Sequence, residues 1–531
     1  MLCCRHRANS QNCVPTFFRR MLQFLKASSQ GTCAVKGVKG KWAEPIVCLS
    51  TRTTHHLKNL AEMPGPSAIS FAWDLFARKG LSQLHELQLE GRKRYGPIWK
   101  AKFGPILTVH VAEPTLIEQV LRQEGQYPMR SDLSSWKDYR HLRGHGYGLL
   151  TAEREEWQEV RSLLGKHTLR PKAVEAYDGT LNSVVTDLLA SLKRQRDQNV
   201  HGLITDIADE FYRFGLEGIS SVLFESRIGC LESQVPKETK CFIESINTMF
   251  VMTLLTMAMP VWMKRMFPKP WDTFCQCWDY IFHFAKGHID QRLKEESDRL
   301  AQGQEVKGQY LTYFLLRQGL SMKDIYSNVT ELLLAGVDTV RLIFTFSSTL
   351  SWCLYELSRH PEIQTAMRNE VLMVLGGKQI PGAPEVAQMQ LMKAVVKEVL
   401  RLYPVIPGNA RVIPDSDIQI GGYLIPQKTL ITLCHYATSR DASFFSNPNE
   451  FHPERWLTKE QRHHPFASLP FGVGKRSCIG RRIAQLELHL ALARILLQYE
   501  VRPDPDGAVV SPMTRTVLVP KRAINLQFIE L

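Results

Sequence analysis

The stretch FGVGKRSCIG, residues 471–480, places a cysteine between a glycine-rich turn and an apolar helical pattern. Ile479, Ile483 and Leu486 begin that pattern, so the sequence predicts a helix that starts at or just after Cys478. The free N–H groups and the dipole at a helix N-terminus favour a thiolate over a thiol. The glycines leave room for something flat or bulky to approach the sulfur. The alternative interpretation is a buried structural cysteine beside a turn.

A second group of residues is able to form buried or surface ion pairs. Glu398 and Arg401 in EVLR lie three residues apart, on one face of a helix that ends before Pro404. Arg455, in the proline-broken loop FHPERW, is a third candidate member of this group. The alternative is an ordinary surface pair.

The apolar helical stretch LLLAGVDTV, residues 332–340, is interrupted by glycine, aspartate and threonine. The Thr339 hydroxyl could bond back to the preceding turn and open the helix locally, and Asp338 beside it could relay protons. A simple helix kink is the alternative.

Cations and one indole form a fourth candidate group. Trp157 and Arg161 lie four residues apart on one helix face, and Arg411 falls in an extended segment. Together with Arg476 beside the cysteine, they could converge on anionic groups. Taken singly, each is equally explained as a solvated cation or a core aromatic residue.

The elements that must position these residues are mostly helical. Residues 98–111 predict a β-hairpin through Gly104-Pro105, and residues 417–437 predict a second β region. Between and after them, helical patterns cover residues 153–169, 205–226, 240–258, 272–298, 322–359, 385–403 and 479–499. No linker or internal repeat divides the chain after residue 67, so we expect one large, mainly α domain with a small β region.

The net charge of +14 over 531 residues is concentrated at the N-terminus. Residues 1–60 hold ten Lys/Arg and one acid, which leaves the rest with 56 basic and 51 acidic side chains. This leader is rich in Ser and Thr, contains the basic amphipathic stretch FFRRMLQFLK, and predicts a mitochondrial transit peptide. A disordered basic tail is the alternative. The twelve cysteines form no zinc-like CxxC pairs, which favours a reducing compartment.

Together these residues resemble the cytochrome P-450 family of haem-thiolate monooxygenases, over essentially the whole body, residues 62–531. The resemblance is carried by Phe471, Gly474, Arg476, Cys478, Gly480, Glu398, Arg401, Ala335-Gly336 and Asp338-Thr339. It implies that Cys478 ligates the iron of haem b, in a loop with Phe471 and Gly474. It also implies that Trp157, Arg161, Arg411 and Arg476 contact the haem propionates.

On the distal side, the resemblance implies that Asp338 and Thr339 deliver protons, whereas the ion-pair group is structural. The resemblance further implies a protein electron donor, since the chain has no nicotinamide or flavin fingerprint. Lys393, Lys397, Arg481 and Arg482 resemble the patch by which mitochondrial members bind a [2Fe–2S] ferredoxin of the adrenodoxin type, itself reduced by an NADPH-dependent reductase. Ordinary exposed lysines are the alternative, and no nucleic-acid partner is expected.

Much of the chain resembles the vitamin D and sterol branch of the mitochondrial group. That likeness implies hydroxylation by O2 of a lipophilic secosteroid, 25-hydroxyvitamin D at the 1-alpha position. Side-chain hydroxylation of a sterol or vitamin D is the alternative, and a non-oxygenating haem-thiolate sensor is the alternative of another class. The substrate pocket is expected to be apolar and lined by Val405, Ile406, Asn409 and Thr516.

Two further stretches yield expectations. Residues 250–271 are apolar and then basic and are broken by Pro260, so they either dip into the inner-membrane surface or form a buried helix and loop. Relatives pass from AGVDTV into TLSW after about two residues, whereas RLIFTFSS intervenes here. An excess of about six residues rotates a continuous helix by about 240° net, so we expect a bulge or looped-out segment around 341–347, or an error in the gene model.

Overall fold

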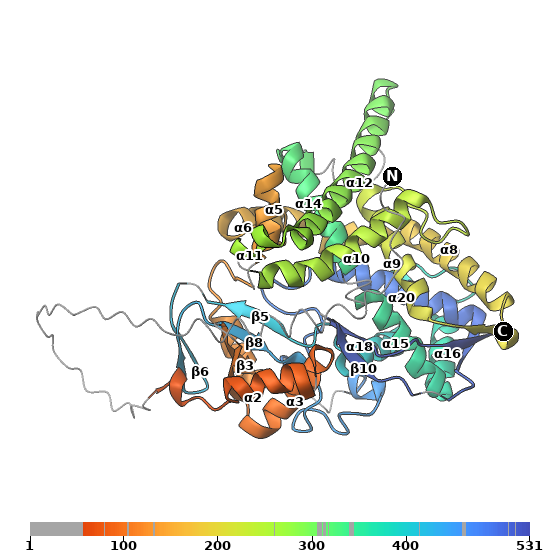
Figure 1. Cartoon of the computed structure of the whole chain (residues 1–531). Helices are drawn as coiled ribbons and strands as arrows, with labels where there is room; N and C mark the ends of the chain where they lie inside the picture. The colour runs from red at the N-terminus through yellow and green to blue at the C-terminus, as the bar shows by residue number, and fades with distance from the viewer. Residues whose placement is uncertain are drawn as a thin grey trace, which may run out of the picture.

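The computed structural model describes residues 57–531 except 79, 104–105, 131–132, 260, 305–310, 312–314, 317, 339–344, 414, 459–462, 508 and 516. Helices dominate the described residues (Figure 1). They are α2 (Ala68–Trp73), α3 (Leu84–Tyr95), α4 (Pro114–Arg122), α5 (Ser134–Arg143), α6 (Arg154–Thr168), α7 (Pro171–Glu175), α8 (Asp178–Asp197), α9 (Ile207–Phe224), α10 (Lys237–Ala258), α11 (Val261–Met266), α12 (Pro268–Ala301), α14 (Met322–Asp338), α15 (Thr345–Arg359), α16 (Pro361–Leu375), α17 (Ala383–Val386), α18 (Gln390–Leu402), α19 (His435–Ser439) and α20 (Arg481–Gln498). Proline at the first helical position begins several of them, as its fixed φ and missing N–H favour.

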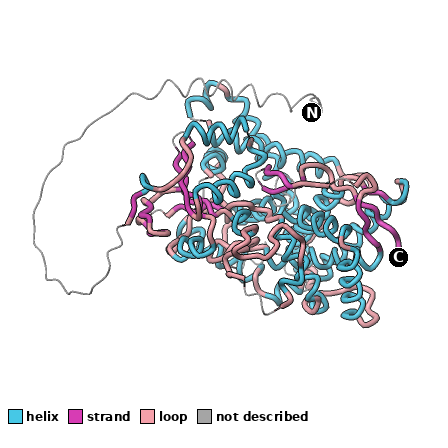
Figure 2. The backbone as a smooth tube through the Cα atoms, turned by 90° about the horizontal axis from the view of Figure 1, so that it is seen from below, coloured by secondary structure: helices cyan, strands magenta, loops and turns pink. Residues whose placement is uncertain are grey.

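The strands form small separate groups rather than one large sheet (Figure 2). Their bounds are β1 (Lys58–Asn59), β2 (Ile98–Phe103), β3 (Ile106–Val111), β4 (Leu203–Ile204), β5 (Asn409–Val412), β6 (Ile418–Ile420), β7 (Tyr423–Ile425), β8 (Leu430–Leu433), β9 (Tyr499–Pro503), β10 (Pro512–Arg515), β11 (Val517–Pro520) and β12 (Leu526–Glu530). The described strands form sheets in the orders β2-β3-β8-β5, β1-β7-β6, β4-β12-β9 and β10-β11. The prediction of a mainly α fold with a small β region is confirmed.

The hairpin predicted at residues 98–111 is confirmed, because β2 and β3 pair antiparallel with Ile98 opposite Val111. β8 pairs with β3 on one side and with β5 on the other, so Arg411 on β5 lies opposite Ile431. A bridge from Met129 to Val412 then brings the segment before α5 alongside β5. This edge of the sheet therefore carries Arg411 and its neighbours towards the cysteine loop.

The helical patterns and the elements differ in two places. The pattern over 385–403 is split into α17 and α18. The pattern over 322–359 is helical at both ends, as α14 and α15, and residues 339–344 between them lie outside the described residues. The expected bulge at 341–347 falls mainly on residues 341–344, which lie outside the described residues. The second β region was expected to reach residue 437, but His435–Ser439 forms α19, whose Tyr436 N–H donates to the Pro407 carbonyl at 2.8 Å rather than to a strand.

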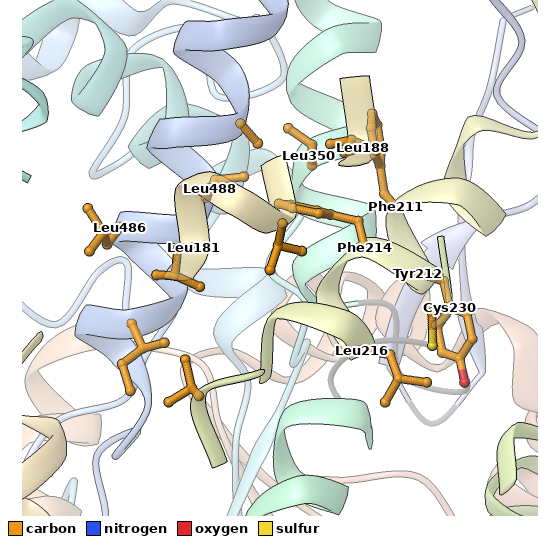
Figure 3. Packing of buried hydrophobic residues seen from close by; sticks show 14 of the residues in the cluster. Leu181, Leu188, Phe211, Tyr212, Phe214, Leu216, Cys230, Leu350, Leu486 and Leu488 are labelled. Carbon is orange, nitrogen blue, oxygen red and sulfur yellow. The ribbon is translucent and has the colours of Figure 1, made fainter. Parts of the chain in front are cut away.

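The main core lies among α8, α9, α15 and α20 (Figure 3). Phe211 and Phe214 of α9 point towards Leu188 of α8, Leu350 of α15 and Leu488 of α20. All five side chains are buried, so these helices form one apolar body. α20 is the helix that follows the cysteine loop, and this packing fixes its position.

Candidate active site

The cysteine loop is a tight turn that leads into α20. The Cys478 N–H donates to the Phe471 carbonyl at 2.8 Å, and the Ser477 N–H donates to the Gly474 carbonyl at 3.1 Å. Gly474 has a φ of +79°, a conformation that favours glycine, and a Cβ there would lie 2.8 Å from a carboxylate oxygen of the buried Glu124. α20 begins at Arg481, which confirms the predicted helix start.

The Cys478 thiol is partly exposed and has cations on several sides. Burial raises its pKa, and the Gly480 backbone N–H, Arg130, Arg161 and Arg481 offset part of that rise. The net direction differs from the preference for thiolate that the sequence indicated, because loss of solvation outweighs the donors. A bound metal cation deprotonates a coordinating thiol outright, so this environment is compatible with a thiolate ligand.

Cys434 provides a contrast within the same chain. It is fully buried at the end of β8, where its sulfur lies 3.9 Å from Nδ1 of His110. Burial raises the pKa of the Cys434 thiol, and no arginine contributes to that shift. The two cysteines therefore differ in solvent access and in the number of nearby cations. Of the two, Cys478 has the surroundings that suit a thiolate ligand.

α6 and the cysteine loop are joined by the cations that the sequence predicted to converge. Arg161 of α6 donates to the Ser477 carbonyl at 2.7 Å. The Arg476 guanidinium carbon lies 3.8 Å from the ring centroid of Trp157, and its Nε donates to the Pro128 carbonyl at 2.8 Å. The Trp157 side chain is only 2% exposed.

Arg411 reaches the same region from β5. Its Nε donates to Glu124 at 2.8 Å and its Nη1 donates to the Ala410 carbonyl at 2.9 Å. Arg130 also belongs to this group, because its Nη2 donates to the Arg476 carbonyl at 2.6 Å. Arg130 and Glu124 were not predicted as site residues, since neither lies in a periodic pattern or motif and each meets its partner only through the tertiary fold.

The charges of this group test whether haem fits. Burial, together with Arg130, Arg411 and Arg161, lowers the pKa of Arg476 to about 9. Burial and Arg411 lower the pKa of Arg130 to about 10. Four guanidinium groups therefore lie close together, those of Arg130, Arg161, Arg411 and Arg476. Glu124 is the carboxylate that pairs with one of them, so bound anions would stabilise the group. The two propionates of haem b would supply them, so the residues present fit the group.

A buried ion-pair group joins α18 to the segment that contains Arg455. Arg401 donates to both carboxylate oxygens of Glu398, at 2.9 and 2.7 Å, and Arg455 donates to Glu398 at 3.1 Å. All three side chains are fully buried, so the surface-pair alternative is wrong. Arg455 lies in a short 3-10 helix, Pro453–Trp456, rather than in an irregular loop. These ion pairs hold α18 against this 3-10 helix, which agrees with the structural role expected for the group.

The other predicted site residues are placed less completely. Asp338 is the last residue of α14, whereas Thr339 and Thr516 lie outside the described residues. Val405 is buried in the main core, and its carbonyl accepts from the Leu518 N–H at 2.9 Å. Ile406 packs against that core, and Asn409 accepts a 3.4 Å hydrogen bond from Arg411.

The predicted docking cations lie on α18 and at the start of α20. The Lys393 ammonium donates to the Ala387 carbonyl, and the exposed Lys397 ammonium lies 4.0 Å from the ring centroid of Trp456. Arg481 and Arg482 are both exposed. These four residues are called the docking patch below. One of them, Arg481, has its guanidinium carbon 5.8 Å from the ring centroid of Phe471 in the cysteine loop.

Comparisons with known proteins bear on the whole chain. The sequence model of the family Cytochrome P450 matches residues 63–528. The human mitochondrial 25-hydroxyvitamin D-1 alpha hydroxylase is 54% identical over 520 residues, which cover 96% of this chain and 100% of that protein. The mitochondrial sterol 26-hydroxylase of Oryctolagus cuniculus is 42% identical, over 89% of each chain. A solved cytochrome P450DA heme domain is similar in fold, with a TM-score of 0.73 at 23% identity, over 88% of this chain and 98% of that domain.

Proposed function

This chain belongs to the cytochrome P450 family, and on that premise we propose that it is a mitochondrial monooxygenase that hydroxylates 25-hydroxyvitamin D at the 1-alpha position. The observation that carries the proposal is the 54% identity, over 96% of the chain, to the human protein of that name. The rabbit sterol 26-hydroxylase, which represents side-chain hydroxylation, is more distant at 42%. Members of the family bind haem through a cysteine thiolate, and haem b is accordingly the cofactor.

The proposed site residues hold the haem, pass protons or orient the substrate. The haem, when bound, supplies the oxygen-activating chemistry, which its thiolate ligand promotes by pushing electron density to favour O–O cleavage. Cys478 holds the iron, while Trp157, Arg161, Arg411 and Arg476 hold the propionates, with Arg130 supporting Arg476. The Asp338 carboxylate and the Thr339 hydroxyl hold and pass protons on the distal side. Val405, Ile406, Asn409 and Thr516 line an apolar pocket that orients the substrate.

Electrons come from another protein, a [2Fe–2S] ferredoxin with an NADPH-dependent reductase. The docking patch supports this proposal because solvent-accessible cations, two of them at the start of the helix that follows the cysteine loop, suit a transient contact with an acidic partner. Two of its members, Lys393 and Lys397, are held close to α18 by contacts to a carbonyl and to an indole ring. The patch is therefore partly ordered before the partner arrives.

Residues 1–60 act as a mitochondrial transit leader, and residues 62–531 form the monooxygenase domain. The support is the basic, acid-poor composition of the leader, together with the mitochondrial naming of the relatives. N-terminal sequencing of protein purified from mitochondria tests this assignment. A mature chain that begins well after Met1 is expected, and an intact Met1 would contradict it.

The domain lies on the matrix side of the inner membrane as a peripheral protein. Among the described residues, no helix has the length and apolar character needed to cross a bilayer. In α11 and directly after it, Trp262, Met266 and Phe267 are each more than half exposed. The exposed Arg265 lies among them, whereas Lys264 pairs with Asp138. Exposed apolar side chains next to cations suit insertion into an anionic lipid surface. Release from inner membranes by alkaline carbonate is expected, and retention would contradict peripheral attachment.

One reconstitution tests the reaction. Purified holoprotein is incubated with ferredoxin, reductase, NADPH and 25-hydroxyvitamin D, and the new hydroxyl group is located by NMR. We expect a ferredoxin-dependent product with the hydroxyl group at the 1-alpha position. A hydroxyl group on the side chain would instead favour the sterol-type reaction. No product from fully haem-loaded protein would favour a binding or sensing role.

A further inference from the structure

Glu331 on α14 anchors the connection between α5 and α6. Its side chain is fully buried, and one carboxylate oxygen accepts the backbone N–H groups of Leu150 and Thr151, at 2.8 and 3.2 Å. The other oxygen accepts the Thr151 hydroxyl at 2.7 Å. The proposed chemistry of the site does not use this carboxylate, yet it is tied to a segment 180 residues away in the sequence.

The negative charge of Glu331 is balanced by a buried cation. Nη2 of Arg140, on α5, donates to Glu331 at 3.2 Å, and both side chains are fully buried. The Arg140 guanidinium carbon lies 4.0 Å from the ring centroid of Trp278 and 4.5 Å from that of Phe282, both on α12. Glu331 is therefore the point at which α5, α12 and the connection meet α14.

Two glycines let the connection lie directly against α14. A Cβ at Gly148 would lie 2.5 Å from a Glu331 oxygen and 2.9 Å from the Ser327 carbonyl oxygen. A Cβ at Gly146 would lie 2.9 Å from an Asp324 oxygen. Since real Cβ atoms do not approach so closely, the connection rests on the α14 surface one helical turn after another.

The contact joins the two halves of the proposed site. The connection leads straight into α6, which begins at Arg154 and carries Trp157 and Arg161. Asp338 follows Glu331 by seven residues, which is two helical turns or about 10 Å along α14. We propose that Glu331 is a positioning residue that fixes the haem-holding helix α6 relative to the proton-delivering end of α14, and so keeps electron use coupled to hydroxylation.

This inference rests on the proposed roles of Trp157, Arg161 and Asp338. Its test compares product formed per NADPH consumed, at equal haem content, in holoprotein reconstituted with ferredoxin and reductase. Glu331→Gln removes the charge that balances Arg140 and one acceptor of backbone N–H groups. We expect the yield of product per NADPH to fall about tenfold, with peroxide rising, because one charge-assisted hydrogen bond has about that value.

Thr151 supplies a milder pair of variants if Glu331→Gln binds too little haem. Thr151→Val loses the hydroxyl that donates to Glu331 and is expected to lower the yield a few-fold. Thr151→Ser keeps that hydroxyl and should restore the wild-type yield, which a purely structural defect would not do. The matched control is Arg143→Gln, which breaks the half-exposed Arg143–Asp279 pair between α5 and α12 and should change nothing.

Wild-type product yield in Glu331→Gln, or in Thr151→Val when Glu331→Gln cannot be loaded with haem, would overturn the proposal. Equal losses in Thr151→Val and Thr151→Ser would also overturn it. A wrong substrate assignment appears differently, because the wild-type protein itself would then give no product from 25-hydroxyvitamin D. In that case the same variants are compared on cholesterol, the probe for the sterol-type reaction.

Discussion

The Arg476 guanidinium carbon lies 3.8 Å from the centroid of the Trp157 ring, so a cation–π contact joins the cysteine loop to α6. Arg476 and Trp157 are both candidate contacts of the haem propionates, although they are more than 300 residues apart in the sequence. A consequence of the cation–π contact is that retention of haem should depend on an aromatic ring at position 157.

We expect Trp157→Leu to release haem faster than the wild type and Trp157→Phe to fall between them. Loss of the cation–π contact removes about 1–2 kcal/mol, and the smaller side chain adds a cavity. The measurement is the rate of haem transfer to apomyoglobin. Trp352→Leu is the control, since Trp352 is equally buried but stacks on Tyr403. Equal rates for Trp157→Leu and Trp352→Leu would contradict a specific role.

The buried ion-pair group should contribute strongly to the stability of the folded chain. In Arg401→Lys, an ammonium replaces a guanidinium that donates to Glu398 and to the carbonyls of Ser439, Pro448 and Glu450. Lysine lacks the fork that satisfies these acceptors, so we expect a loss of about 3–5 kcal/mol in the free energy of unfolding, measured with urea. Arg502→Lys, in an exposed pair with Glu500, should lose less than about 1 kcal/mol. A comparably small loss in Arg401→Lys would show that the group is dispensable.

The docking patch predicts a change in partner affinity rather than in chemistry. In Lys393→Gln and Lys397→Gln we expect the KM for ferredoxin to rise about fivefold or more, with a weaker dependence on salt and an unchanged affinity for substrate. Lys286→Gln on α12 removes an exposed lysine that pairs with Asp290 and serves as the control. If all three variants have the same ferredoxin kinetics, the partner binds another face.

Three buried histidines predict a loss of stability in acid. Burial lowers the pKa of His110 to about 4, and burial with a nearby cation does the same for His435 and His489. The unfolded chain takes up these protons near pH 6.5, before the folded protein does. Their contribution is therefore intact above pH 6.5 and is lost as the pH falls through 4, by up to about 3 kcal/mol for each histidine.

The free energy of unfolding, measured between pH 7 and 5, should show this dependence. In His110→Gln the slope against pH should fall by about one proton, whatever the absolute stability of the variant. An unaltered slope in His110→Gln would mean that His110 is protonated in the folded state.

The sequence predicted those parts of the site that depend on short-range pattern. The start of α20 after Cys478 and the pairing of Glu398 with Arg401 follow from spacing along one helix. Arg130 and Glu124 could not be predicted, because their partners, Arg476 and Arg411, are brought to them only by the bridge and strand pairing of the folded chain.

The degree of burial of each site residue could not be predicted from the sequence either, and burial changes the pKa of the cysteine ligand. A cysteine before a helix was expected to favour the thiolate, but loss of solvation raises the pKa of Cys478 despite the nearby cations. The end of the predicted β region is also different, since α19 forms there. The Tyr436 N–H donates to the Pro407 carbonyl, a tertiary contact that the local pattern does not indicate.

The absorption spectrum of the reduced carbon monoxide complex reports which residue ligates the iron. Cys478→Ser and Cys434→Ser are compared with the wild type at matched haem content. Thiolate ligation by Cys478 predicts that the red-shifted Soret band of this complex is lost in Cys478→Ser and kept in Cys434→Ser. Survival of that band in Cys478→Ser, or its loss in Cys434→Ser alone, would contradict the account.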